Sequence, residues 1–203
     1  MKLVVNHDVG AGGIRETLHR DVLPGLGSGS GVVITADGLV LTAGHVCRRA
    51  HQDVLFTFPD GTTAPGRTIG IDAEADTGLM RITVPGPWPH VAVGDFRDAR
   101  LGDWVLAFGH PGGFDQHRSL VVRLGRIIRA APGVVQTDCT ISPGDSGGPL
   151  FDMHGRVVGI HSAISTSPAE NFHVPITEYF DTWTTLASGE AETTSGFFKL
   201  IPW

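Results

Sequence analysis

Residues Ile141 to Phe151 read ISPGDSGGPLF, and this stretch decides the fold. Ser146 stands between turn-forming residues and two glycines, and apolar residues follow at once. A serine hydroxyl is a poor nucleophile unless a histidine base, an acid that orients the histidine and amide donors accompany it. Glycines let the backbone turn so that amides converge on one point. We therefore predict that Ser146 is a nucleophile and that the amides of Gly144 and Ser146 form an oxyanion hole.

Two further stretches supply a candidate base and a candidate acid. LTAGHV sets His45 among small residues directly after a predicted strand. DAEADTGLMRI sets Asp76 directly before an apolar strand, which favours a partly buried carboxylate. Asp72 is the alternative acid, but no apolar strand follows it directly. We predict that His45 accepts the Ser146 proton and that Asp76 orients the imidazole, so that activity rises with pH as His45 loses its proton.

Most of the chain is typical of short strands separated by turns. The stretches Ala36-Asp37-Gly38 and Pro59-Asp60-Gly61 predict tight turns between strands, and a proline-rich stretch over residues 84–90 separates two halves. A helix is predicted over residues 177–189. Its apolar face has helical spacing, and glycine at 189 suits a helix end. The predicted face comprises Tyr179, Phe180, Trp183 and Leu186.

The stretches TAGH, DAEADTGLM and TDCTISPGDSGGPLF, in this order, resemble the chymotrypsin-like serine proteases, and most closely the bacterial HtrA (Deg) branch. GSGSGVVITADGLVLTAGHV is similar to the first hairpin of that branch, and GRVVGIHSAISTSPAENFHVPI to its last strands. The resemblance covers about residues 27–186. It implies an all-β fold of two perpendicular antiparallel β-barrels with a C-terminal helix. It also implies a serine endopeptidase that acts on protein or peptide substrates from a cleft between the barrels.

The resemblance divides the chain into three parts. Residues 1–24 are expected to be an N-terminal extension, residues 25–189 a trypsin-like protease domain, and residues 190–203 a C-terminal tail that is apolar enough to dock. Within the domain we expect one barrel over about 25–90, another over about 98–176 and a helix over 177–188. No PDZ module is expected after the domain.

The sequence departs from the HtrA pattern beside the nucleophile. HtrA proteins usually carry Asn before the serine, whereas Asp145 stands here, as in trypsin. Trypsin pairs that aspartate with a newly cut N-terminus. The chain has no IVGG-type start, so activation by cleavage is not expected. The counter-charge of Asp145 should then be an arginine or a backbone amide. The sequence Asp76-Thr77-Gly78 also departs from the usual Asp-Leu-Ala.

The resemblance also implies a set of residues for the primary specificity pocket. His161 matches a histidine that binds Glu or Gln side chains in glutamyl endopeptidases and picornavirus-type proteases, which would favour cleavage after an acidic or amide residue. The HtrA pattern instead favours small aliphatic residues, and a histidine bonded within the barrel is a third reading. The residues that the resemblance assigns to the pocket are Thr140, Ile141, His161, Ser162, Ala163, Ile164 and His173.

Other classes of protein fit less well. A catalytically silent or latent HtrA-like peptide-binding protein is the alternative function. Ser146 also satisfies G-x-S-x-G, but an α/β-hydrolase needs its acid and histidine after the serine, and too little chain follows. Neither H-E-x-x-H nor C-x-x-C is present, so we expect no metal and no cofactor.

Composition limits partners and compartment. The net charge of −6 without a Lys/Arg cluster disfavours nucleic acid, and no apolar run is long enough for a membrane span. The resemblance implies that a homo-oligomer, a trimer, is to be expected. It is cytoplasmic if Met1 is the true start, and periplasmic or exported if a signal segment was removed. Cys47 and Cys139 are expected to be buried free thiols, with a single disulfide as the alternative.

Overall fold

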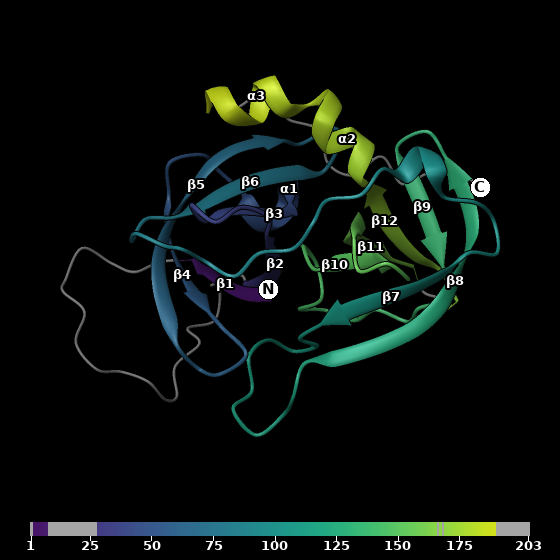
Figure 1. Ribbon diagram of the computed structural model, residues 1–203, viewed down its shortest axis with the longest axis horizontal. Helices are drawn as coiled ribbons and strands as arrows, with labels where there is room; N and C mark the ends of the chain where they lie inside the picture. Colours follow the sequence, from purple (N-terminus) through teal and green to yellow (C-terminus); the bar gives the residue numbers. More distant parts are fainter. Residues whose placement is uncertain (1, 8–27, 166, 168, 190–203) are drawn as a thin grey trace.

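The computed structural model describes residues 2–7, 28–165, 167 and 169–189. It contains two closed six-stranded antiparallel barrels, which lie side by side, with two short helices over them (Figure 1). The all-β, chymotrypsin-like fold expected from the sequence is thereby confirmed. In the first barrel the strand order is β1-β2-β3-β6-β5-β4, and in the second it is β10-β11-β12-β9-β8-β7.

The strands of the first barrel are β1 (Lys2–His7), β2 (Ser28–Val33), β3 (Leu39–Ala43), β4 (Asp53–Thr57), β5 (Thr63–Asp72) and β6 (Thr77–Ile82). Strand β1 pairs with both β2 and β4 and so closes the barrel. The first barrel therefore starts near the N-terminus, and residues 2–7 do not belong to an extension outside it. The glycine of the predicted Ala36-Asp37-Gly38 turn has φ +90° and joins β2 to β3, because glycine alone adopts this backbone readily.

The strands of the second barrel are β7 (Trp104–Gly109), β8 (Val121–Ala131), β9 (Val134–Thr137), β10 (Pro149–Asp152), β11 (Val157–Ile164) and β12 (Asn171–Pro175). A short 3-10 helix, η1 (Phe96–Asp98), precedes β7. The barrel is filled by apolar side chains that alternate inward along the strands, as period-two patterning requires. The core of this barrel comprises Val105, Ala107, Ile127, Val135, Cys139, Ile141, Leu150 and Val158.

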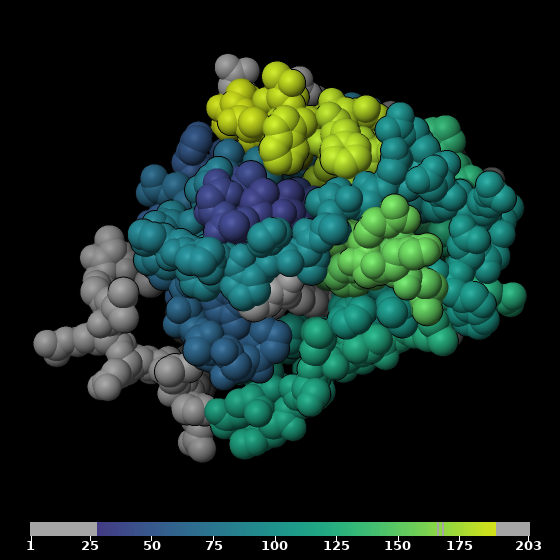
Figure 2. Space-filling model, viewed as in Figure 1, coloured from purple at the N-terminus to yellow at the C-terminus, as the bar shows by residue number. Residues whose placement is uncertain are grey.

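The segment between β6 and η1 binds both barrels. The amide of Val91 donates to the carbonyl of Val33 in the first barrel (3.1 Å), and the amide of Gly94 donates to the carbonyl of Val157 in the second (2.8 Å). In the space-filling view this teal segment runs across the face between the two halves (Figure 2). Because it is hydrogen-bonded on both sides, it fixes the barrels relative to each other rather than acting as a free linker.

The C-terminal helical region is two helices rather than the single helix predicted. Helix α2 (Ile176–Asp181) and helix α3 (Trp183–Ser188) meet at Thr182, whose φ and ψ of −92° and 3° are not helical. The hydroxyl of Thr182 donates to the carbonyl of Glu178 (2.7 Å), a local bond that competes with continued helix. Tyr179 and Leu186 are buried as predicted, but Phe180 and Trp183 are 50% and 37% exposed.

A second apolar cluster joins the helices to both barrels: Tyr179 and Leu186 pack there with Leu79 of β6 and Ile160 of β11. Tyr179 donates its hydroxyl hydrogen to the carbonyl of Thr42 in β3 (2.6 Å), and α3 packs so closely on β5 that a Cβ at Gly70 would overlap the backbone of Leu186. Both cysteines are buried free thiols, as predicted; burial raises the pKa of Cys47 to about 12. The tail over residues 190–203 lies outside the described residues.

Candidate active site

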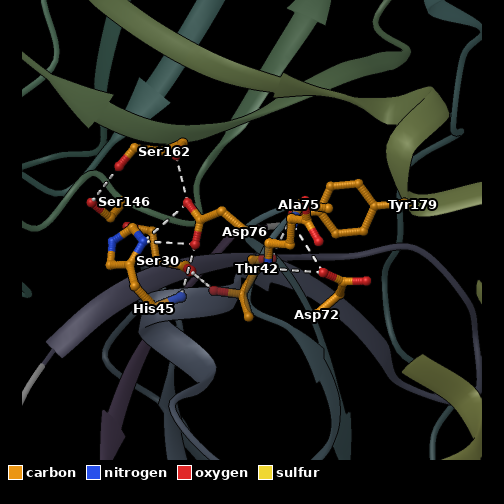
Figure 3. A network of polar contacts seen from close by, with 10 residues as sticks. Ser30, Thr42, His45, Asp72, Ala75, Asp76, Ser146, Ser162 and Tyr179 are labelled. Carbon is orange, nitrogen blue, oxygen red and sulfur yellow. Dashed lines mark hydrogen bonds and ion pairs between the residues drawn. The ribbon is translucent and has the colours of Figure 1, made fainter. Parts of the chain in front are cut away.

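Two side chains of the first barrel and one from a loop of the second converge on the candidate site. His45 lies on α1 (Gly44–Cys47), a single helical turn that directly follows β3, and Asp76 lies just before β6. Ser146 belongs to the turn that precedes β10. Figure 3 shows the Ser146 side chain beside the His45 imidazole, with the Asp76 carboxylate on the other side of the ring. The three residues predicted from separate motifs therefore meet.

Asp76 binds His45 through both its side chain and its backbone. Nδ1 of His45 lies 3.0 Å from Oδ1 and 3.1 Å from Oδ2 of Asp76, and the His45 amide donates to Oδ1 (2.9 Å). Asp76 has φ +53°, a left-handed backbone that short polar residues such as aspartate tolerate better than other side chains do. Because the carboxylate can only accept, Nδ1 carries the hydrogen and Nε2 is left as the proton acceptor.

Ser162 is a partner of Asp76 as well as a pocket residue. Its hydroxyl donates to Oδ2 of Asp76 (2.5 Å), and its carbonyl accepts from the Ser146 hydroxyl at 3.5 Å. Burial opposes ionisation of Asp76, but hydrogen bonds from His45 and Ser162 and the charge of His45 hold its pKa below the usual range. The resemblance assigned Ser162 to the specificity pocket, and nothing in the surrounding sequence indicated its hydrogen bond to Asp76. Asp72, the alternative acid, instead accepts the amides of Glu74 and Ala75 and so caps the turn before Asp76.

The loop before Ser146 presents two unused amides. The carbonyl of Pro143 accepts from the Gly112 amide (2.8 Å). In a trans peptide group the C=O and the following N–H point in opposite directions, so the Gly144 amide faces away from this bond. Among the described residues, neither the Gly144 nor the Ser146 amide donates a hydrogen bond. Gly144 has φ +95°, and a Cβ there would crowd the His110 carbonyl. The backbone therefore requires glycine here and leaves two donors for a ligand oxygen.

The first barrel holds this loop through Ser30. The Ser30 hydroxyl donates to the Gly144 carbonyl (2.8 Å), and the Ser30 amide donates to the Ser146 carbonyl (2.7 Å). The Ser30 carbonyl in turn accepts from the hydroxyl of Thr42 (2.8 Å), and a Cβ at Gly147 would overlap both groups. Ser30 lies within the GSGSG stretch that resembled the HtrA hairpin, but its contact with the loop was not predicted.

A pocket of about 200 Å³ opens next to Ser146. Apart from Ser142, Ser146 and Ser162, its walls are aliphatic or proline side chains. The residues that line it are Ile141, Ser142, Pro143, Ser146, Ser162, Ala163 and Ile164. Four of the residues expected in the pocket are therefore present: Ile141, Ser162, Ala163 and Ile164.

Thr140, His161 and His173 were also expected in the pocket, and they do not line this cavity. His161 and His173 are fully or almost fully buried. Nδ1 of His161 lies 2.9 Å from Nδ1 of His173, Nε2 of His161 lies 3.1 Å from the Phe108 carbonyl, and Nε2 of His173 lies 2.8 Å from the Thr137 hydroxyl. The rings are bonded inside the barrel, behind the pocket wall, and burial lowers the pKa of His173 to about 3.

Within the described residues, no cluster of His, Cys, Asp and Glu side chains is arranged to hold a metal ion. None of the helices in this same part of the chain has the length and apolar character needed to cross a bilayer.

Known proteins with the same pattern place the chain in a family. The model of the trypsin-like peptidase domain matches residues 29–160. A protein of Pseudomonas putida strain W619 named "Probable periplasmic serine endoprotease DegP-like" is 39% identical over 142 residues, which are 68% of this chain and 29% of the relative. One of the same name from Pseudomonas fluorescens is 37% identical over 169 residues, 79% of this chain and 35% of the relative. The chain thus spans about a third or less of these curated relatives.

Solved structures agree with the fold. The HtrA-type protease AlgW with a tripeptide matches with a TM-score of 0.72 and 26% identity, over 92% of this chain and 60% of that chain. The serine endoprotease from Yersinia pestis matches with a TM-score of 0.71 at 23% identity, which supports the fold alone. The chain belongs to the trypsin-like peptidase family, in its HtrA-type branch.

Proposed function

We propose that this domain is a serine endopeptidase that cleaves protein substrates through Ser146, His45 and Asp76 and an acyl-enzyme. The observation that carries the proposal is the pair of amides at Gly144 and Ser146, which donate to nothing among the described residues. They belong to the loop whose Ser146 side chain lies beside the His45 ring, which Asp76 binds from its other side (Figure 3). Such donors stabilise the negative oxygen of a tetrahedral intermediate.

The proposed steps follow from the bonding of His45. Because Nδ1 is held by Asp76, Nε2 accepts the Ser146 proton as Oγ attacks the substrate carbonyl. The Asp76 carboxylate stabilises the imidazolium, and Nε2 then gives the proton to the leaving amine. Water enters, His45 accepts its proton, and the water oxygen attacks the acyl carbon, which releases Ser146. His45 then gives the proton that it took from water to Oγ of Ser146, so that both side chains return to their starting state.

A fluorophosphonate probe tests the reaction, because it reacts only with an activated serine. Wild-type protein should be labelled, and Ser146→Ala and His45→Ala should not. Ser188→Ala, a serine on the far helix α3, is the matched control and should be labelled as the wild type is. If wild type and Ser188→Ala both stay unlabelled, the serine protease proposal is wrong and a latent or silent peptide-binding protein remains.

For specificity we propose small aliphatic residues before the cleaved bond. The pocket beside Ser146 has apolar walls formed by Ile141, Ala163 and Ile164, and the ring nitrogens of His161 are engaged by His173 and Phe108. A buried acidic side chain in such a pocket would lack a partner. Profiling a peptide library should give Val or Ala before the cut, whereas dominance of Glu or Gln would contradict the proposal.

The cellular compartment of this domain is inferred from its relatives. Their names place them in the periplasm, and a periplasmic or exported location is the corresponding expectation for this domain. Fractionation of cells that express the full natural protein tests it, and recovery in the cytosolic fraction would contradict it.

A further inference from the structure

A largely buried arginine side chain points into the second barrel. Along β8 the exposed and inward positions alternate, and Arg123 lies at an inward one, opposite Ala107 of β7. Its side chain is only 18% exposed. A guanidinium in a barrel filled with aliphatic side chains is costly unless a charge compensates it. The structure therefore requires a reason for this residue.

The compensating charge is Asp145, the residue directly before Ser146. Nη2 of Arg123 lies 3.0 Å from Oδ2 of Asp145, whose side chain is fully buried. This answers the question raised by the sequence, where Asp145 stood without the partner that trypsin provides. Since the arginine belongs to a strand of the barrel, the folded domain itself supplies the counter-charge, where trypsin uses its N-terminus.

The same carboxylate is tied to the loop backbone. Oδ2 of Asp145 accepts the Ser142 amide (2.9 Å), and the Asp145 amide donates to the Ser142 carbonyl (2.9 Å). The two bonds close the turn over residues 142–145. The amides of Gly144 and Ser146 belong to the peptide groups at the end of this turn. The position of the Asp145 carboxylate thereby determines the conformation of the segment that presents the proposed oxyanion donors.

Gly109 provides the space for the pair. A Cβ at Gly109 would overlap Oδ1 and Cγ of Asp145 and lie 2.8 Å from Nη1 of Arg123. Within the described part of the chain, Oδ1 of Asp145 and Nη1 of Arg123 have no hydrogen-bond partner. The ion pair thus depends on one close contact at 3.0 Å, and removal of either partner leaves a buried charge without compensation.

We propose that Arg123 is a positioning residue for catalysis: its ion pair with Asp145 holds residues 142–146 in the conformation that exposes the Gly144 and Ser146 amides. The loop then needs neither a newly cut chain end nor a partner protein to become ordered. The catalytic consequence rests on the proposed function, whereas the effect on loop order does not.

The loop is tested first without any activity, by hydrogen exchange in a Ser146→Ala background. Arg123→Met should accelerate exchange of the Ser142 and Asp145 amides by at least about tenfold, because the carboxylate loses its anchor. Amides of the first barrel should keep their protection. Equal protection of the loop with and without Arg123 would overturn the inference, whether or not the protein is an enzyme.

Catalysis is tested in the otherwise unaltered chain by kcat/KM and by the rate of fluorophosphonate labelling. Loss of oxyanion donors typically reduces kcat by about 10²–10³-fold, so Arg123→Met should lose about 100-fold with little change in KM. Arg123→Lys retains the charge and should lose less. Arg81→Met removes an exposed ion pair with Asp37 and is the matched control, expected to stay within about twofold of wild type.

A double variant separates the role of the pair from simple destabilisation. Arg123→Met/Asp145→Asn leaves no unpaired buried charge, so it should fold even if Arg123→Met does not. Its labelling rate should recover at least about tenfold over Arg123→Met and remain about tenfold below wild type, since the anchor is still absent. A double variant that equals wild type in labelling and loop protection would show that the pair is dispensable.

Discussion

Nδ1 of His161 and Nδ1 of His173 lie 2.9 Å apart inside the second barrel. The Phe108 carbonyl can only accept, so Nε2 of His161 carries a hydrogen. In the neutral pair, Nδ1 of His161 therefore accepts from Nδ1 of His173, whose Nε2 accepts the hydroxyl hydrogen of Thr137. The chain of donors runs in one direction, and an extra proton would break it.

This arrangement predicts acid sensitivity of the fold. The pKa of His173 falls to about 3 on burial, below its ordinary value of about 6.5, so the unfolded chain takes a proton that the folded chain does not. Stability should fall by up to about 1.4 kcal/mol per pH unit as pH drops from about 6.5 toward 3. His173→Gln should flatten this dependence in urea titrations at several pH values, whereas His90→Gln, at an exposed position, should not. A wild-type stability that is flat over this range would contradict the prediction.

A second prediction concerns the bond between Ser162 and Asp76. Ser162→Ala removes a hydrogen bond to a carboxylate, worth about 1.5–3 kcal/mol, so kcat/KM should fall roughly tenfold to a hundredfold. The lowered pKa of Asp76 stabilises the fold above its unfolded-state pKa, and this contribution is lost as pH falls through the folded-state pKa. The variant should therefore also show a smaller loss of stability across that acid range. Steady-state kinetics and urea titrations at acid pH measure the two effects; unchanged values for both would refute the role.

Gly109→Ala tests the space around Asp145 while leaving both charges in place. The added methyl group would overlap the carboxylate, which must move away from Arg123 and the Ser142 amide. We expect a loss of about 100-fold in fluorophosphonate labelling. Circular dichroism and thermal unfolding should show a folded protein. Wild-type labelling in a folded variant would mean that the carboxylate position tolerates displacement.

Tyr179→Phe tests how the helices attach to the first barrel. The Tyr179 hydroxyl donates to the Thr42 carbonyl inside the protein, and the substitution removes this buried hydrogen bond. The free energy of unfolding should fall by about 1–3 kcal/mol in urea titration. Phe180→Leu, at a half-exposed position of the same helix, should change it by less than about 0.5 kcal/mol. Equal effects of the two variants would argue against the hydrogen bond.

The local motifs indicated short strands in two halves and singled out the three residues at the site, and their resemblance to a known family implied the two barrels. Such motifs can be read because glycine or aspartate stands where the backbone requires it. Gly144 at φ +95° and Asp76 at φ +53° are examples. Contacts between distant strands were not predictable. Arg123 lies on β8 in what reads as an ordinary strand, and only the closed barrel brings it to Asp145. His161 illustrates the same limit, since its neighbours in sequence do not reveal His173 as its partner.

The bond from Tyr179 to Thr42 also limits when, during synthesis of the chain, the domain can complete its fold. His45 and Asp76 leave the ribosome well before Ser146, and Tyr179 leaves later still. Because Thr42 and Ser30 of the first barrel bind α2 and the nucleophile loop, these contacts form only when nearly the whole domain has been synthesised. The nascent chain therefore contains His45 and Asp76 before Ser146 is added, and the candidate site is complete only when residues of both barrels have been synthesised.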